Sequence, residues 1–175
     1  MWYVVQTITG KEKELVAVLD RVLKKECYER CFVIQRECVW RIQGHYRLHI
    51  ELMFPSYIFV ETDVPEKFYF ALKQIPKSTK LLGGGEAFLP IQAEEENLLK
   101  KMIAEDPDNI VRRTLVTVNS KGELCLVEGM LKGFSERIVK KRLRKRYVII
   151  EIPFLGRTKR VRVEIQLEGD KEICE

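Results

Sequence analysis

The fold is decided by the stretch RVRVEIQL, residues 160–167, in which apolar and polar side chains alternate. Val161 and the apolar residues at every second position after it predict a β-strand with one buried face. Two further apolar stretches, 124–127 and 147–152, are bounded by glycine and proline residues that predict turns. About sixty residues of short strands fit a small closed barrel, which leaves no long sheet edge exposed.

The pattern upstream of these strands is helical in three places. Residues 11–25 carry apolar side chains at helical spacing, and Thr9-Gly10-Lys11-Glu12 fits a capping box at the start of that helix. Asp63 and Pro65 predict a second helix start, and a third helix is predicted over 92–103. Strands are predicted over 1–7, 30–39, 56–61 and 80–82, with a hairpin arm over 41–51.

A polar stretch separates the two patterns. Residues 104–113, AEDPDNIVRR, carry acids, proline and asparagine with little apolar content, which is typical of a linker. The sequence therefore predicts an α+β protein with two domains. An α/β sandwich of helices on an antiparallel sheet is expected over 1–104, a linker over 105–115, and the small β-barrel over 116–175.

The positive charge is concentrated in the predicted barrel. The net charge is +5, and residues 1–113 contribute none of it because they hold 17 basic and 17 acidic side chains. Seven of the ten residues from Arg137 to Arg146 are basic. One interpretation is a solvated hairpin tip. The other is a nucleic-acid contact, since like charges this close repel unless a phosphate backbone neutralises them.

Other classes of function find little support. Cys27, Cys31, His45 and His49 have a zinc-finger spacing, but the histidines lie in a strand-like stretch rather than on a helix. We therefore expect reduced thiols and neither a metal nor a cofactor. The sequence has no phosphate-binding glycine motif and no catalytic set of an enzyme. It also has no secretory signal or membrane span, so we expect a cytoplasmic protein that is not an enzyme.

Three stretches together resemble one known family. They are WYVVQTITGKE at 2–12, MFPSYIFVE at 53–61 and GELCLVEGMLKGFSERIV at 122–139. This combination is similar to the NusG family of transcription elongation factors, and the similarity spans nearly the whole chain. It implies an N-terminal NGN domain, a linker and a C-terminal KOW-type barrel.

The chain departs from the general members of that family at two places. Glu136 replaces the glycine that usually follows the KOW phenylalanine, and KKRLRKR at 140–146 replaces an acidic or neutral turn. These departures resemble the specialised LoaP branch, which implies a monomeric antitermination factor that promotes read-through of terminators. Two alternatives stay open: an RfaH-like factor that reads non-template DNA, and a general elongation factor that couples polymerase to the ribosome or a termination factor.

The resemblance also implies two contacts of the NGN domain. Residues Gln6, Glu51, Phe54, Pro55 and Tyr57 match the surface that binds the clamp helices of the RNA polymerase largest subunit. The simpler alternative is that the aromatic residues are core strand residues, as alternation already predicts for Ile58 and Val60. The candidates for contact with non-template DNA are Lys73, Gln74 and Lys77, which otherwise belong to a solvated helix face and turn.

The resemblance to LoaP implies that the barrel reads an RNA hairpin in the leader transcript. We expect contact with RNA grooves and phosphates, because only Tyr147 and Phe154 offer aromatic rings nearby. A second basic cluster is expected beside the first across a short turn, so that both lie along one side of the barrel. The candidate RNA-binding residues are Arg137, Lys140, Lys141, Arg142, Arg144, Lys145, Arg146, Arg157, Lys159 and Arg160.

Overall fold

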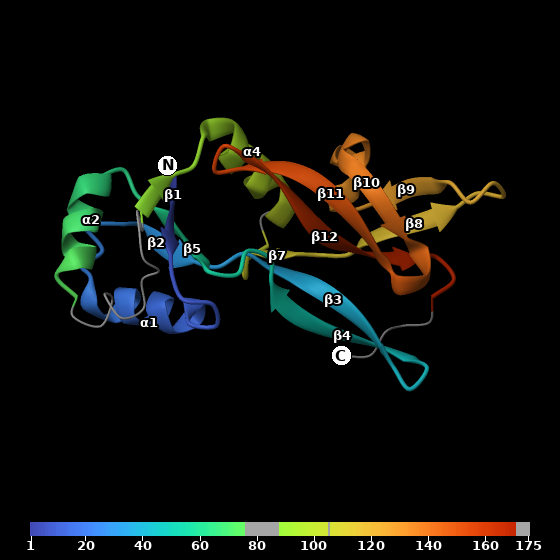
Figure 1. The fold of residues 1–175 in the computed structure, drawn as a ribbon, viewed down its shortest axis with the longest axis horizontal. Coiled ribbons are helices and arrows are strands. Elements are labelled where there is room, and N and C mark those ends of the chain that lie inside the picture. Colours follow the sequence, from blue (N-terminus) through green and yellow to red (C-terminus); the bar gives the residue numbers. More distant parts are fainter. Residues whose placement is uncertain (76–87, 105, 171–175) are drawn as a thin grey trace. The chain divides into compact units, whose positions relative to one another are not determined.

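A computed structural model describes residues 1–75, 88–104 and 106–170 (Figure 1). Contacts group the chain into two units. The first comprises Met1–Ile34 and Phe54–Asn97, and the second comprises Gln35–Met53 and the residues from Leu98 onward. The second unit thus includes a hairpin from the N-terminal half as well as the predicted barrel. Within the described ranges, no helix is long and apolar enough to span a bilayer.

The first unit is built on a four-stranded antiparallel sheet in the order β2-β5-β1-β6. Its strands are β1 Trp2–Gln6, β2 Arg30–Phe32, β5 Tyr57–Glu61 and β6 Phe88–Pro90. The helices are α1 Glu12–Val22, α2 Pro65–Lys73 and α4 Ala93–Ile103, the last of which begins in the first unit and ends in the second. These three helices of the described residues were predicted, and the observed limits of α1 and α4 lie within a few residues of the expected ones.

Both faces of this sheet are covered. On one face, Ile58 and Val60 pack with apolar residues of α1 and α2, which confirms their predicted place in the core. On the other face, Trp2 and Phe59 belong to an aromatic cluster in which their ring centroids lie 6.1 Å apart. Each such buried side chain contributes roughly 1.5–3 kcal/mol through burial. Two-sided burial explains why residues 58–60 of β5 are apolar in succession instead of alternating.

The predicted capping box does not form. Lys11 is the N-cap of α1 and makes no side-chain cap hydrogen bond. The Glu12 carboxylate instead accepts a hydrogen bond from the Ser56 backbone N–H at 2.7 Å, and it is buried there. The prediction of a capping box is wrong because Glu12 binds the loop before β5, a tertiary contact, instead of the backbone at the start of its own helix.

A β-hairpin opens the second unit. β3 Gln35–Ile42 pairs antiparallel with β4 His45–Leu52, and the two-residue turn between them has positive φ at Gln43 (50°) and Gly44 (84°). This is the turn geometry that matches the twist of a hairpin. The predicted strand over 30–39 is therefore two strands in different units, β2 and β3. Part of the predicted linker is also a strand, since β7 Ile110–Val111 pairs parallel with β3.

The C-terminal part forms a curled five-stranded sheet in the order β10-β11-β12-β8-β9 (Figure 1, yellow to red). Neighbours pair antiparallel except β12 and β8, which run parallel. Every second residue of β11 from Val148 to Phe154 is buried, as the alternating pattern requires. The bounds are β8 Thr114–Val118, β9 Leu124–Glu128, β10 Ile138–Arg142, β11 Tyr147–Phe154 and β12 Arg157–Leu167. The predicted α+β fold class is confirmed.

Short 3-10 turns connect these strands: η1 Met130–Gly133, η2 Ser135–Arg137 and η3 Leu143–Lys145. Gly129 precedes η1 with φ of +99°, and a Cβ at that position would lie 3.1 Å from Thr114. The Thr114 hydroxyl accepts a hydrogen bond from the Leu131 N–H at 3.0 Å. Glycine is therefore needed where this turn approaches β8. The predicted strand over 80–82 lies outside the described residues.

Candidate nucleic-acid interface

The basic residues gather on the edge strand β10 and on the turn η3 that follows it. Arg137 is also exposed, at the opposite end of β10 from η3. Within the described part of the chain, the exposed cations of β10 and η3 form no ion pair. These cations are Lys140, Lys141, Arg142, Arg144 and Lys145, and together we call them the basic edge.

Arg146, the next residue, has a different role. Its Nε donates a hydrogen bond to Asp170 Oδ2 at 2.7 Å, its Nη2 pairs with Oδ1 of the same carboxylate, and its Nη1 donates to the Leu143 carbonyl. The Arg146 side chain is only 15% exposed. This hydrogen bonding raises the pKa of Arg146. Arg146 thus stabilises the η3 turn, and its charge is paired with that of Asp170.

The second basic cluster is not continuous with the first. Arg157 pairs with Phe154, whereas Arg142 pairs with Tyr147, seven residues away at the other end of β11. At about 3.3 Å per residue, this separates the two ends by roughly 23 Å. The expected arrangement across one short turn is therefore wrong for Arg157 and the η3 end of the first cluster. Arg160, by contrast, pairs with Glu151, the residue next to the partner of Ile138.

Two members of that second cluster, Lys159 and Arg160, also have local partners. Arg160 donates to the Glu151 carboxylate at 2.9 Å from an exposed position. The Lys159 ammonium lies 5.3 Å from the centroid of the Phe154 ring, and burial lowers the pKa of Lys159.

The outward face of the sheet carries a further arginine that the sequence analysis missed. Lys140 and Arg162 are the partners of Ile149 on either side of β11, so their side chains share one face of the sheet. The Arg162 guanidinium lies 4.1 Å from the centroid of the Tyr147 ring, which is on the same strand face. The sequence could have predicted this, because the alternation of residues 160–167 places Arg162 on the same side of the strand as the candidate Arg160.

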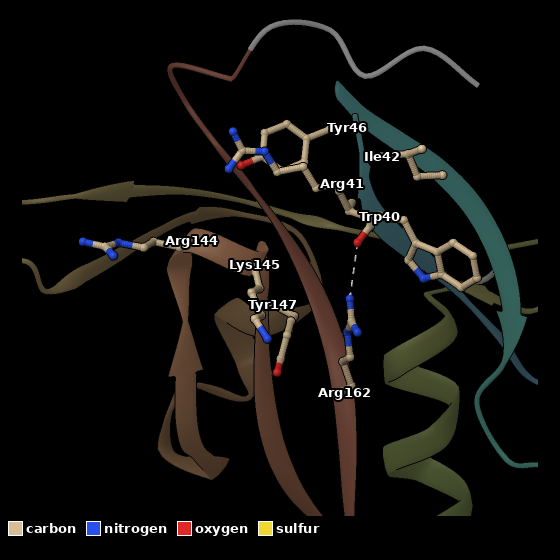
Figure 2. A pocket seen from close by; sticks show the side chains of 9 residues that line it. Trp40, Arg41, Ile42, Tyr46, Arg144, Lys145, Tyr147 and Arg162 are labelled. Carbon is tan, nitrogen blue, oxygen red and sulfur yellow. Dashed lines mark hydrogen bonds between the residues drawn. The ribbon is translucent and has the colours of Figure 1, made fainter. Parts of the chain in front are cut away.

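The β3–β4 hairpin packs on this outward face. Arg36 Nη1 lies 3.1 Å from the Glu164 carboxylate, and Arg162 donates a hydrogen bond to the Val39 carbonyl at 3.4 Å (Figure 2). The Glu164 side chain is 0% exposed. Burial raises its pKa, while Arg162 and Arg36 act in the opposite direction. The two arginines balance this buried acid and join the hairpin to the barrel sheet.

The residues expected to bind polymerase have mixed exposure. Phe54 is 1% exposed and packs edge-on against Phe59, so its expected place at the surface is wrong. Phe54 lies in the bend between β4 and β5, where no alternating pattern distinguishes a core position from a surface position. Pro55 is exposed, and Gln6 and Tyr57 are half-buried neighbours on β1 and β5. Glu51 belongs to the second unit, where it pairs with Arg36 at 2.8 Å.

The residues expected near non-template DNA lie at the end of α2. Lys73 and Gln74 are exposed there, and the Lys73 ammonium lies 4.3 Å from the centroid of the Tyr69 ring. Lys77 lies outside the described residues. Phe70, also on α2, is 65% exposed and was not singled out in the sequence.

The hairpin brings together three potential metal ligands. Ligand atoms of Cys38, His49 and Glu51 lie within 4.8 Å of one another because Cys38 and His49 are cross-strand partners. Cys27 and Cys31 of the considered zinc spacing belong to the first unit. Burial raises the pKa of Cys38 to about 12, so this thiol is neutral in the metal-free protein. The pairing of Arg36 with Glu51 further opposes a cation.

The family model and the curated relatives that match this chain all carry the name NusG. A family model described as "Transcription termination factor nusG" matches residues 1–100. The chain is 23% identical over 168 residues to the transcription termination/antitermination protein NusG of Haemophilus influenzae, covering 93% of this chain and 90% of that protein. It is 25% identical over 171 residues to NusG of Bacillus subtilis, covering 93% and 94%.

Among solved structures, one described as "Domain interaction in Thermotoga maritima NusG" is similar with a TM-score of 0.48 and 16% identity, covering 93% of this chain and 92% of that chain. The curated relatives are named as transcription proteins and not as enzymes. The family model covers more than half of the sequence. The chain therefore belongs to the NusG family of transcription termination and antitermination proteins.

Proposed function

We propose that this NusG-family protein is a specialised antitermination factor that binds RNA polymerase and a structured leader RNA at the same time. Polymerase binding is assigned to the N-terminal segment 1–104 and RNA reading to the segment 116–175, joined by 105–115. The result of this double contact is a polymerase that reads through terminators on transcripts that carry the hairpin.

The observation that carries the proposal is the basic edge. Its five cations are exposed on one edge strand and its turn, without an acidic partner in the described part of the chain. Such crowding costs folding free energy through repulsion unless counter-charges are supplied. Phosphates supply them, and each neutralised phosphate releases counterions into solution.

RNA fits this surface better than regular duplex DNA. A-form RNA has a deep, narrow major groove, which opens where a bulge or mismatch interrupts the helix. The narrow edge strand β10 ends at Arg142, and Arg144 follows on η3. Both present forked guanidinium groups that pair bidentately with phosphates or guanine edges. The lysines of the basic edge add point charges that bind without sequence preference.

For the polymerase contact, we propose the rim formed by the exposed Pro55 and the half-buried Gln6 and Tyr57. Phe54 supports the rim from the core rather than touching the partner. Lys73 and Gln74 remain candidates for a contact with non-template DNA. Glu51 is less suited to the polymerase contact, because Arg36 and His49 already bind its carboxylate.

RNA binding is tested by titrating the full-length protein against an RNA hairpin over a range of salt concentrations. Four to six phosphate contacts predict a slope of log affinity against log salt of roughly −3 to −5. The variant Lys140→Gln with Arg142→Gln should reduce the magnitude of the slope by roughly 1.5 to 2. The matched control is Lys13→Gln with Lys24→Gln, two exposed lysines of the first unit, which should leave the slope unchanged. A slope near zero for the wild type would refute the proposal.

A general elongation factor is the second candidate, because the curated relatives are named transcription termination/antitermination protein NusG, without mention of a leader RNA. That function predicts an effect on polymerase that is independent of any leader hairpin. Transcription templates with and without the hairpin therefore separate the two candidates.

A further inference from the structure

A cavity of about 520 Å³ opens where the β3–β4 hairpin meets η3 and the adjoining ends of β11 and β12 (Figure 2). Its size lies within the range of sites that hold small organic ligands. Four of its nine lining residues are cationic and none is acidic. The lining residues that matter here are Arg41, Tyr46, Arg144, Lys145, Tyr147 and Arg162. We call it the tyrosine cavity.

Two half-buried tyrosines form its aromatic surfaces. The guanidinium of Arg162 lies 4.1 Å from the ring centroid of Tyr147, and the guanidinium of Arg41 lies 5.8 Å from that of Tyr46. Arg146 lies on the Tyr46 ring as well, at 5.1 Å. Rings and guanidinium planes of this kind are the surfaces on which unpaired bases stack.

The register of the hairpin defines which side chains face the cavity. Arg41 and Tyr46 are cross-strand partners and share one face of the hairpin, whereas Trp40 pairs with Arg47 and shares the other. The Trp40 ring packs edge-on against His49, with ring centroids 4.0 Å apart, on that other face. Trp40 also lines the cavity, but its ring is in contact with His49, so we assign the stacking surface to the two tyrosines.

We infer that the tyrosine cavity binds a single unpaired nucleotide of the RNA, turned out of its helix. This rests on the proposed RNA-binding function and extends it from phosphate contact to recognition of an unpaired base. The base stacks on Tyr46 or Tyr147, and its phosphates lie toward Arg144 and Lys145. These two residues belong to both the basic edge and the cavity, so the helical phosphates and the extruded nucleotide occupy neighbouring parts of one surface.

The mixed chemistry of the cavity favours a nucleotide over other occupants. An inorganic anion would leave the two rings unused, and an apolar peptide would bury cations without a partner. The walls are also held in place before binding, since Arg36 binds Glu164 and Arg162 binds the Val39 carbonyl. A preformed site reduces the ordering cost of binding.

The test compares two RNA hairpins that are identical except for one unpaired 2-aminopurine, which is present as a bulge in one and absent from the other. We expect the full-length protein to bind the bulged hairpin roughly tenfold more tightly, the effect of stacking one base on aromatic side chains. The 2-aminopurine fluorescence should fall on binding because the base stacks. This fluorescence measurement needs no variant and is independent of folding defects.

Variants then locate the stacking surface. Tyr46→Leu with Tyr147→Leu should abolish the preference for the bulge, and Tyr46→Phe with Tyr147→Phe should keep the preference. Phe70→Leu, an exposed aromatic residue of the first unit, is the control and should change neither.

The outcomes separate the two proposals. Salt-dependent binding of both hairpins with equal affinity, and no change in fluorescence, would overturn the nucleotide cavity and leave the RNA-binding function intact. No binding of either hairpin would refute both. A preference for the bulge that survives loss of both tyrosine rings would place the base elsewhere and overturn the inference.

Discussion

At the scale of single residues, Arg146 differs from the basic edge because it pairs with Asp170 and so stabilises the barrel instead of offering its charge to a ligand. Burial acts to raise the pKa of Asp170, but hydrogen bonds from Arg146 and from the Leu167 N–H outweigh it and hold the pKa below its usual value of 3.8. A carboxyl group with a lowered pKa in the folded state contributes stability that is complete above its unfolded pKa.

This contribution should disappear as the pH falls through the lowered pKa of Asp170, because protonation breaks the pair. Asp170→Asn should reduce the free energy of unfolding by about 2 kcal/mol at pH 7. It should also make the stability less dependent on pH below about 4. Chemical denaturation at pH 7 and at pH 3 measures both effects. Equal losses in the variant at the two pH values would contradict this role.

Phe54 and Tyr57 should respond differently to truncation although three positions separate them. Phe54→Ala removes a buried ring and should destabilise the protein by about 3–5 kcal/mol. Tyr57→Ala removes a half-buried side chain of the proposed polymerase rim, so it should weaken polymerase binding with a much smaller loss of stability. Thermal melts and a polymerase pull-down compare the two. A Tyr57→Ala protein that is stable and binds polymerase normally would remove Tyr57 from the contact.

At the scale of elements, the β3–β4 hairpin determines the shape of the candidate site. Arg36 joins it to the barrel sheet by pairing with Glu164, and it also pairs with Glu51 within the hairpin. Loss of one partner from a buried ion pair leaves an uncompensated charge, which typically costs 3–5 kcal/mol. Arg162 still balances Glu164 in this protein, so a loss of about 2 kcal/mol is expected here.

Arg36→Gln should therefore loosen the hairpin before it unfolds the barrel. Amide hydrogen exchange should become faster across residues 35–52 and change less in β11. Arg47→Gln, an exposed arginine of the same hairpin, is the matched control and should leave exchange unchanged. Uniformly faster exchange through both β-sheets would mean that the hairpin and the barrel open as a single cooperative unit.

Local patterns predicted the elements better than their pairing. The helices and the alternating strand at 160–167 follow from side-chain spacing, which needs no tertiary information. The break between β2 and β3 is invisible in the sequence, because Ile34 is as apolar and buried as a strand residue. The Cys38–His49 proximity and the tyrosine cavity depend on hairpin register and packing, which no local pattern specifies.

At the scale of the whole molecule, we assign polymerase binding to the first unit and RNA binding to the second unit, which includes the β3–β4 hairpin. Membership of the NusG family is established by the match over residues 1–100. The RNA-reading function instead depends on the basic edge, beyond that match. Of the ten RNA-binding candidates from the sequence, Arg146 is paired internally and Arg157 lies at the end of β11 away from η3, so we propose the basic edge as the main RNA contact.

The most direct test is the fraction of transcripts that read through a terminator in vitro, measured with purified polymerase on templates with and without the leader hairpin. We predict that the protein raises read-through only on the hairpin template, and that Lys140→Gln with Arg142→Gln removes most of this gain. An equal effect of the protein on both templates would contradict it.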